Sequence, residues 1–351
     1  MPSLQQIADE LSVSVSLVSK VLNNRLGTTG ARPELAARIH DTAQRLGYRK
    51  NLNAAALKAG RQQVIAVLIH RHGSQGSGLV EALLAGISHA TRQRHQRQIL
   101  SFYNDIPQFA EIVHEYHTGM IDGLIVSGVR HPNLMDELLG LHSRGLPIVT
   151  VFNRPISDVL PNVGTPDEQI ILAAMRHLIA LGRRRILHVS SLKDREVGYD
   201  LGLKEAGLER DEDLVFYDRG DDNTFVLENG IGAVRRALAN NVAFDAVCAQ
   251  SDTQALGAMH ELIRAGKRIP EDIVVTGVDD SPFAQLAFVP LTSVDQRYED
   301  RGHQAVELLD RLVRQQPTQS IDFEPVLNVR QSTELANADP EPTVNDRRTT
   351  N

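Results

Sequence analysis

Residues 4–24 read LQQIADELSVSVSLVSKVLNN, and the Ser/Val alternation in the middle is by itself typical of a half-buried strand. The residues on both sides of it follow a helical pattern instead. Ser3 and Gln6 form a capping-box pair before one apolar stripe, and Ser14 can cap a second (Leu4, Ile7, Ala8 and Leu11; Val18, Val21 and Leu22). The residues between the stripes then form a tight turn, so the stretch predicts a helix-turn-helix.

The second of these helices has a polar outward face when its apolar stripe points inward. Lysine reaches guanine acceptors, serine reaches either base edge and valine contacts a thymine methyl, so this face suits the DNA major groove (Val15, Ser16, Ser19 and Lys20). A third helix is predicted with Pro33 in its first turn and Gly47 at its C-terminal end. A small helical bundle that binds no nucleic acid is the alternative.

Charge is divided unequally along the chain. The first 62 residues hold nine Lys/Arg and four Asp/Glu, a net charge of +5, whereas the whole chain carries −7 and the remainder therefore −12. A basic segment on an acidic body indicates that the segment meets a polyanion, with an affinity that depends on phosphate contacts and on salt.

Composition excludes several other classes of protein. Apolar residues make up 42% of the chain and charged residues 23%, which is ordinary for globular domains, and 351 residues suffice for two or three compact units. The single cysteine, Cys248, cannot form an intrachain disulfide, and neither a signal sequence nor an apolar run of about 18 residues is present. We therefore expect a cytoplasmic protein without membrane contact.

From residue 63 onward, apolar β-branched runs alternate with amphipathic helical runs. Clear examples of the apolar runs are VIAVLI (64–69), GLIVSG (123–128), RILHVSS (185–191) and IVVTGV (273–278). The alternation predicts buried parallel sheets of the doubly wound type, and its restart halfway along predicts two similar lobes. In such sheets, ligands bind beyond the carboxyl ends of the strands.

Four segments resemble signatures of the LacI/GalR family of bacterial transcriptional regulators: LQQIADELSVSVSLVSKVLNN, RLGYRKNLNAAALKAG, QSDTQALGAMHELIRAGKRIPEDIVVTGVDD and PLTSVDQRYEDRGHQAVELL. The resemblance implies an α/β chain with an all-α head and a two-lobed body of doubly wound parallel sheets, similar to periplasmic sugar-binding proteins. The implied parts are a head (1–50), a hinge helix (51–62) and a body (63–334), with lobe 1 at about 63–162 and 293–322 and lobe 2 at about 163–292 and 323–334.

The resemblance implies that a homodimer binds a palindromic double-stranded operator. Base contacts are expected from Val15, Ser16 and Lys20, backbone contacts from Ser3, Ser14 and Ser19, and minor-groove contacts of the hinge from Asn51, Ala54 and Leu57. Two positions depart from the family pattern. Leu17 replaces a phosphate-contacting threonine, and Lys20 replaces the commoner arginine, which gives up the planar fork that grips guanine at two points.

The resemblance also implies a small effector, a sugar or sugar derivative, between the lobes. Asp279 matches the carboxylate that accepts effector hydroxyls, and Arg195 matches the arginine that grips adjacent oxygens. Further contacts are expected from Asn153, Ser251 and Phe225. Ser251 stands where the family commonly has asparagine, so the pocket differs in detail from known ones.

Catalytic, cofactor and metal sites are not predicted. GSQGSG (73–78) lacks the spacing of a dinucleotide or Walker A loop, and HEYH (114–117) lacks the zinc-protease spacing. We therefore do not expect an enzyme, although a sugar-binding protein or a sugar-acting enzyme with the same body fold is the alternative. The tail, 335–351, is predicted to be disordered and has no leucine heptads, so dimerisation is expected through the body.

Overall fold

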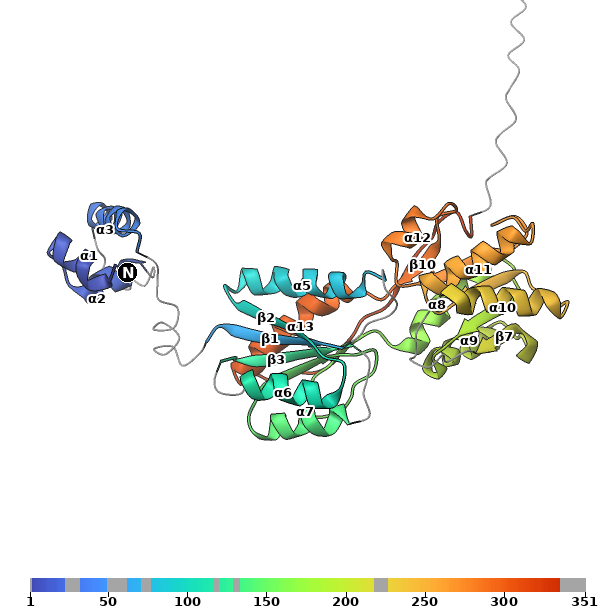
Figure 1. Cartoon of the computed structure of the whole chain (residues 1–351), viewed down its shortest axis with the longest axis horizontal. Helices are drawn as coiled ribbons and strands as arrows, with labels where there is room; N and C mark the ends of the chain where they lie inside the picture. The colour runs from blue at the N-terminus through green and yellow to red at the C-terminus, as the bar shows by residue number, and fades with distance from the viewer. Residues whose placement is uncertain are drawn as a thin grey trace, which may run out of the picture. The chain divides into compact units, whose positions relative to one another are not determined.

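The computed structural model describes residues 2–22, 32–48, 62–70, 77–116, 120–128, 133–217 and 227–334, with only the backbone at 115 and 116. The chain divides into two compact units, residues 1–62 and 63–351 (Figure 1). The expectations for Asn51, Ala54, Leu57 and Phe225 and for the tail lie outside the described residues.

The head contains the predicted helices, α1 (Leu4–Leu11), α2 (Val15–Leu22) and α3 (Pro33–Arg45). Ser3 and Gln6 form both bonds of the capping box, and the Ser14 hydroxyl accepts from the backbone N–H of Leu17 at 3.2 Å. Ser12 adopts a left-handed φ of 53°, and the N–H of Val13 donates to the carbonyl of Ala8 at 2.9 Å, as in a Schellman cap. The alternating Ser/Val stretch is therefore a turn and a cap, as predicted.

Lobe 1 is built on a parallel sheet with the strand order β2-β1-β3-β4. One face packs against α5 and α13, and the other against α6 and α7, because successive side chains of each strand enter opposite cores (Figure 1). The elements are β1 (Val64–Ile69), α5 (Leu79–Gln93), β2 (Arg97–Phe102), α6 (Ile106–Tyr116), β3 (Gly123–Ser127), α7 (Leu134–Ser143), β4 (Ile148–Val151) and α13 (Tyr298–Val313).

Lobe 2 has the strand order β12-β10-β9-β8-β6-β7, parallel except for the edge strand β12. Helices α8 and α9 cover one face, and α10 and α11 cover the other. The elements are α8 (Asp167–Ala180), β6 (Ile186–Ser190), α9 (Lys193–Glu205), a 3₁₀ turn (Glu212–Leu214), β7 (Val215–Tyr217), α10 (Leu227–Ala239), β8 (Ala246–Ala249), α11 (Asp252–Arg264), β9 (Val274–Val278), α12 (Pro282–Leu286), β10 (Thr292–Asp295) and β12 (Val326–Asn328).

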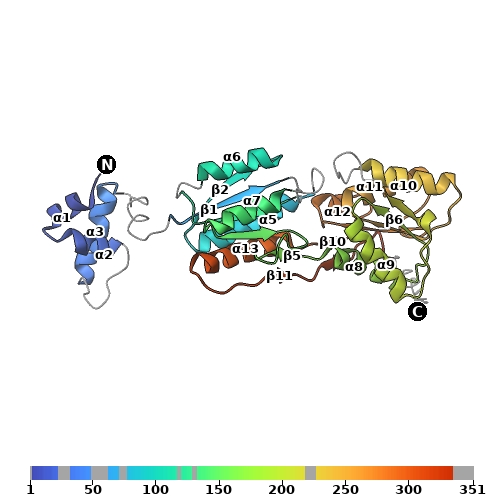
Figure 2. The ribbon, with the colours of Figure 1, turned by 90° about the horizontal axis from the view of Figure 1, so that it is seen from below.

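The chain passes between the lobes before α8, between β10 and α13, and between β11 (Ile321–Asp322) and β12 (Figure 2). The expected lobe boundaries at 163 and 293 fall inside or beside strands. β10 pairs with β9 and β12 of lobe 2 over its length, and β5 (Val163–Gly164) pairs with β11 and adjoins β4. Hydrogen bonding thus assigns 293–295 to lobe 2 and 163–164 to lobe 1.

Helices α5 and α13 cross at Gly86 and Gly302. A Cβ on Gly86 would lie 1.9 Å from a backbone oxygen of α13, and one on Gly302 would lie 2.3 Å from a backbone oxygen of α5. The pair α10 and α11 crosses in the same way at Gly230 and Gly257. Only glycine permits backbones to approach this closely.

Candidate nucleic-acid interface and ligand site

The predicted outward face of α2 is only partly exposed. Ser16 and Lys20 are exposed, and Ser19 is half-buried. Val15 is also half-buried, and it packs against the head core, so only part of its side chain remains available to a base. Ser3 and Ser14 are exposed, with their hydroxyls occupied as helix caps.

The basic character of the head does not come from its folded helices. In the described part of the head, four cations are matched by four carboxylates (Lys20, Arg32, Arg38 and Arg45; Asp9, Glu10, Glu34 and Asp41). Arg45 and Glu10 form an ion pair. The five remaining Lys/Arg belong to residues 23–31 and 49–61, which the structure does not describe. The excess positive charge therefore belongs to residues 23–31, to residues 49–50 at the end of the expected head, and to the expected hinge.

In the body, Arg195 lies at the centre of a buried polar network. It projects from the first turn of α9 and is 5% exposed. Its Nε donates to Oδ1 of Asp167 at 2.9 Å, its Nη1 to the carbonyl of Gln250, and its Nη2 to Oε1 of Gln296 at 3.1 Å. Asp167 is the first residue of α8, Gln250 follows β8 and Gln296 follows β10. The fold therefore brings together three residues that are distant in sequence.

Asn153 connects this network to lobe 1. It follows β4, and its Nδ2 donates to Asp167 at 2.8 Å and to Gln296 at 3.2 Å. Its Oδ1 accepts from Nη1 of Arg301, on α13, at 2.9 Å. Because Asp167 begins a helix of lobe 2 and Arg301 lies on a helix of lobe 1, Asn153 bridges the two lobes.

Asp279 occupies a strained turn after β9. Asp279 and Asp280 have φ values of 110° and 49°, and the turn is held by Asp252, which accepts from the N–H of Ser281 at 2.7 Å and from the hydroxyl of Ser293. Oδ1 of Asp279 accepts from Nε2 of Gln296 at 2.6 Å. Burial, with the neighbouring Asp252 carboxylate, raises the pKa of Asp279 well above its ordinary value.

The sequence-predicted effector residues are thus only partly brought together. Arg195, Asn153 and Asp279 meet through Gln296, whereas Ser251 is buried and its hydroxyl caps α11 by accepting from the N–H of Gln254 at 3.2 Å. Residues of the network that were not expected from the sequence are Asp167, Gln250, Gln296 and Arg301. A signal existed for three of them, since Gln250 begins the quoted segment QSDTQALGAMHELIRAGKRIPEDIVVTGVDD, and Gln296 and Arg301 lie inside the quoted segment PLTSVDQRYEDRGHQAVELL.

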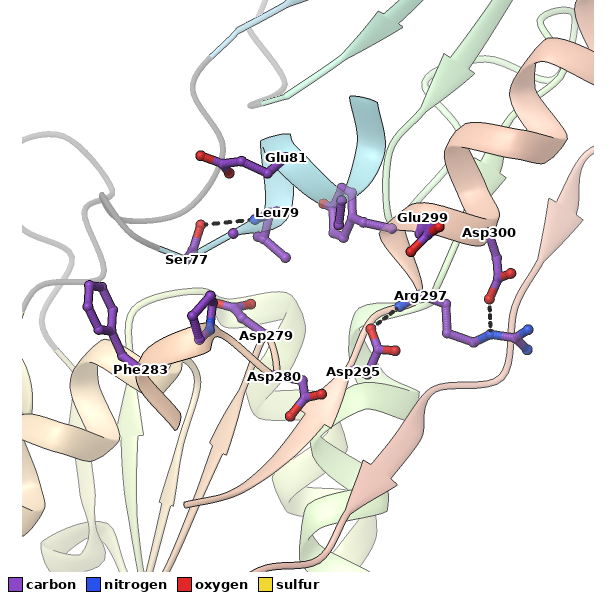
Figure 3. A pocket seen from close by; sticks show the side chains of 14 residues that line it. Ser77, Leu79, Glu81, Asp279, Asp280, Phe283, Asp295, Arg297, Glu299 and Asp300 are labelled. Atoms are coloured by element: carbon purple, nitrogen blue, oxygen red, sulfur yellow. Dashed lines mark hydrogen bonds and ion pairs between the residues drawn. The ribbon is translucent and has the colours of Figure 1, made fainter. Parts of the chain in front are cut away.

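A cleft of about 550 Å³ opens beside Asp279 (Figure 3). The start of α5, the turn after β9, the start of α12 and the crossover into α13 line it. Its lining includes Phe283 and Tyr298, and its charged groups are mostly carboxylates (Glu81, Asp279, Asp280, Asp295, Glu299 and Asp300, with Arg297). Arg297 donates to Asp300 at 2.8 Å, so its charge is already paired.

The described residues offer neither a metal-binding cluster nor a membrane-spanning helix. They contain no group of three or more His, Cys, Asp or Glu arranged to hold a metal ion. None of their helices combines the length and apolar character that a membrane span requires. Cys248 is buried in β8, and burial raises the pKa of its thiol to about 12, as for an inert core cysteine.

Comparison with known proteins gives consistent matches along most of the chain. The family description "Periplasmic binding protein-like domain" matches residues 175–333. The HTH-type transcriptional regulator CelR of Thermobifida fusca is 31% identical over 333 residues, which cover 89% of this chain and 92% of CelR.

Solved structures agree with these sequence matches. A transcriptional regulator CelR–cellobiose complex is 27% identical, with a TM-score of 0.67 over 95% of this chain and 100% of that one. The lac repressor dimer bound to operator and an anti-inducer is 20% identical, with a TM-score of 0.73 over 95% of this chain and 99% of that one. The second likeness concerns the fold alone.

Proposed function

The chain belongs to the LacI/GalR family of transcriptional regulators, and from this membership we propose that it binds a palindromic operator as a homodimer. It is a DNA-binding regulator rather than an enzyme, and a small effector modulates its affinity for DNA. We assign it to the repressors of the family, acting in the cytoplasm where the chromosome is accessible.

Exposure on α2 supports the proposed readout of the operator. Ser16 and Lys20 are available to base edges, Val15 offers its exposed part to a thymine methyl, and Ser3, Ser14 and Ser19 lie at the backbone-contacting positions. Asn51, Ala54 and Leu57 are proposed to enter the minor groove from the hinge. The five cations of residues 23–31 and 49–61 supply the phosphate contacts.

The network around Arg195 is the observation that carries the proposed effector site. Arg195 and Asp279 belong to lobe 2, Asn153 belongs to lobe 1, and all are hydrogen-bonded to Gln296 at a crossover. A ligand that exchanges these bonds for its own hydroxyls changes the angle between the lobes, which is the differential contact that coupling to DNA requires. The cellobiose bound by the similar CelR supports a carbohydrate effector.

Exposed apolar side chains support dimerisation through the body. Phe283, Leu286 and Phe288 are 52%, 82% and 97% exposed around α12, and Leu100 and Phe102 are 39% and 55% exposed on the edge strand β2. Clustered large apolar side chains are uncommon on monomers and mark protein interfaces. A second copy can cover the apolar side chains around α12 and those on β2.

The decisive experiment selects DNA from a random pool with the full-length protein and repeats the binding with saccharides present. A recovered palindrome whose affinity changes with a saccharide supports the proposal. Binding to all sequences equally, with no saccharide effect, would contradict it.

A further inference from the structure

Arg301 is completely buried, and its side chain forms a single hydrogen bond within the described part of the chain. Its Nη1 donates to Oδ1 of Asn153 at 2.9 Å, whereas its Nε and Nη2 have no hydrogen-bond partner there. Burying an arginine with unused donors is costly, and an apolar residue of similar size would avoid that cost. The bond to Asn153 is therefore the contact that distinguishes Arg301 from an apolar side chain.

This bond fixes the orientation of the Asn153 amide. A guanidinium only donates hydrogen bonds, so the atom of Asn153 that faces Arg301 is the carbonyl oxygen. The Nδ2 group then faces lobe 2, where it donates to Oδ1 of Asp167 at 2.8 Å and to Oε1 of Gln296 at 3.2 Å. With the amide reversed, two donors would meet at Arg301, and oxygen would meet oxygen at Asp167.

The same polarity continues through Gln296. Its Oε1 accepts from Asn153 and also from Nη2 of Arg195 at 3.1 Å, so its Nε2 donates to Oδ1 of Asp279 at 2.6 Å. The hydrogen bonds from Arg301 to Asp279 therefore all run in one direction, from a group that only donates, through two amides, to a carboxyl oxygen. Hydrogen bonds aligned head to tail polarise and strengthen one another.

The chain of hydrogen bonds crosses from one lobe to the other. Arg301 lies on α13 and Asn153 follows β4, both in lobe 1, whereas Asp279 follows β9 in lobe 2. A Cβ on Gly302, the next residue after Arg301, would lie 2.3 Å from a backbone oxygen of α5. Since α13 is held this closely against α5, the Arg301 end of the chain moves only with lobe 1.

We propose that Arg301 is a positioning residue, which holds the two lobes at one angle in the unliganded protein by orienting the amides of Asn153 and Gln296. Arg301 itself contacts no effector in this arrangement. The link to DNA rests on the proposed function: an effector that replaces Gln296 as the partner of Asp279 interrupts the chain, and Arg301 then no longer constrains lobe 2.

Energy transfer between two dyes on the full-length protein measures the distance between the lobes. The dyes are attached at Arg92→Cys, on α5, and at Asn240→Cys, directly after α10, because both positions are exposed. Cys248 is buried and does not compete for the dyes. Labelled chains are mixed with an excess of unlabelled chains, so that energy transfer takes place within one chain of a dimer. Without ligand, we expect a single narrow distribution of distances for the wild type.

Two substitutions interrupt the chain at different links. Arg301→Met removes the first donor, and Asn153→Asp keeps the shape of the side chain but presents oxygen to Asp167 in place of N–H. We expect each to displace or broaden the distance distribution. Arg301→Lys keeps a donor for Asn153 and should remain close to the wild type. Arg94→Met is the control, because Arg94 pairs with Glu307 at 2.7 Å within lobe 1.

Thermal unfolding distinguishes positioning from simple stabilisation. Because Arg301→Met removes a buried charge with unused donors, this variant should unfold at or above the wild-type temperature while its lobe distance changes. A residue that only stabilised lobe 1 would give the opposite result, a lower unfolding temperature with an unchanged distance. Should Arg301→Met fail to fold, Asn153→Asp decides, since it leaves Arg301 in place.

A wild-type distance distribution in Arg301→Met or in Asn153→Asp would overturn the inference, and so would an equal shift in Arg94→Met. Operator binding is measured with the same proteins. If the wild type binds no operator, the proposed function is contradicted, while the energy-transfer result still decides the role of Arg301. If the wild type binds the operator and the distances do not change, the failure is confined to Arg301.

Discussion

The guanidinium of Arg195 donates to the carboxylate of Asp167 at 2.9 Å while both residues are more than nine-tenths buried. Removing one member of such a pair leaves an uncompensated buried charge, which costs about 3–5 kcal/mol. We expect Arg195→Leu to lower the free energy of unfolding by that amount, and Arg195→Leu with Asp167→Leu to lower it by less. Urea unfolding measures both.

The exposed pair Arg176–Glu205 joins the same two helices and is the control for this cycle. Its removal should cost less than about 1 kcal/mol. A double variant of Arg195 and Asp167 that is no more stable than Arg195→Leu would contradict the account of the buried pair.

Asp252 gives the body a pH-dependent stability. Burial raises the pKa of this carboxyl from 3.8 to about 6, so the folded state binds the proton more tightly than the unfolded chain. Its contribution is therefore complete below pH 3.8 and is lost as the pH rises through about 6. Relative to Asp252→Asn, the free energy of unfolding of the wild type should fall as the pH rises from 3.8 to about 6. Above that pH, the difference between the two proteins should stay constant.

Urea unfolding of both proteins across this pH range measures the effect. Asp272→Asn is a suitable control, because Arg268 lowers the pKa of Asp272 to about 2, outside the window. A difference between wild type and Asp252→Asn that stays constant with pH would refute the assignment.

Phe288 is 97% exposed beside α12 and is expected to be covered in the dimer. Phe288→Ser should shift the protein toward monomer in sedimentation and should reduce operator affinity, because each half-site then binds alone. Ile263→Ser changes another half-exposed apolar residue, on α11, and should leave the assembly unchanged. An unaltered dimer in the Phe288 variant would place the interface elsewhere.

Lys20 is exposed on α2, and we expect it to contact a base. Lys20→Ala should weaken binding to the selected operator by about 1–3 kcal/mol and relax the preference at one base pair. Arg38→Ala removes an equal charge from α3 and should affect all sequences alike. Competition binding against operators substituted one position at a time distinguishes the two, and a uniform loss for Lys20→Ala would make Lys20 a phosphate contact.

Ser12 holds a left-handed conformation at the end of α1, which costs a non-glycine residue about 1–2 kcal/mol. Ser12→Gly should stabilise the head by about 0.5–1 kcal/mol after the greater entropy of unfolded glycine is allowed for. Slower hydrogen exchange at the α1 and α2 amides of the full-length protein would show it. Ser12→Ala keeps the strain and should show no gain.

The sequence predicts the elements well because their signals are local. Capping serines, helical apolar stripes and apolar strand runs determine the head helices and the alternating lobes without reference to distant residues. The site is only partly predictable, since Gln296 and Arg301 acquire their partners through a crossover between lobes. Ser251 carries no signal that distinguishes a ligand contact from a helix cap, and the structure shows the cap.

The glycine crossings at Gly86–Gly302 and Gly230–Gly257 have a mechanical consequence. Helices in backbone contact cannot slide past one another without collision, so each lobe moves as a rigid body. Any change that a ligand induces in the angle between the lobes must then come from rotations about backbone bonds in the short segments that connect them. Stiffening those connections, for example with proline, would make the affinity of the head for DNA independent of the ligand. The head would still bind DNA, and the body would still bind the ligand.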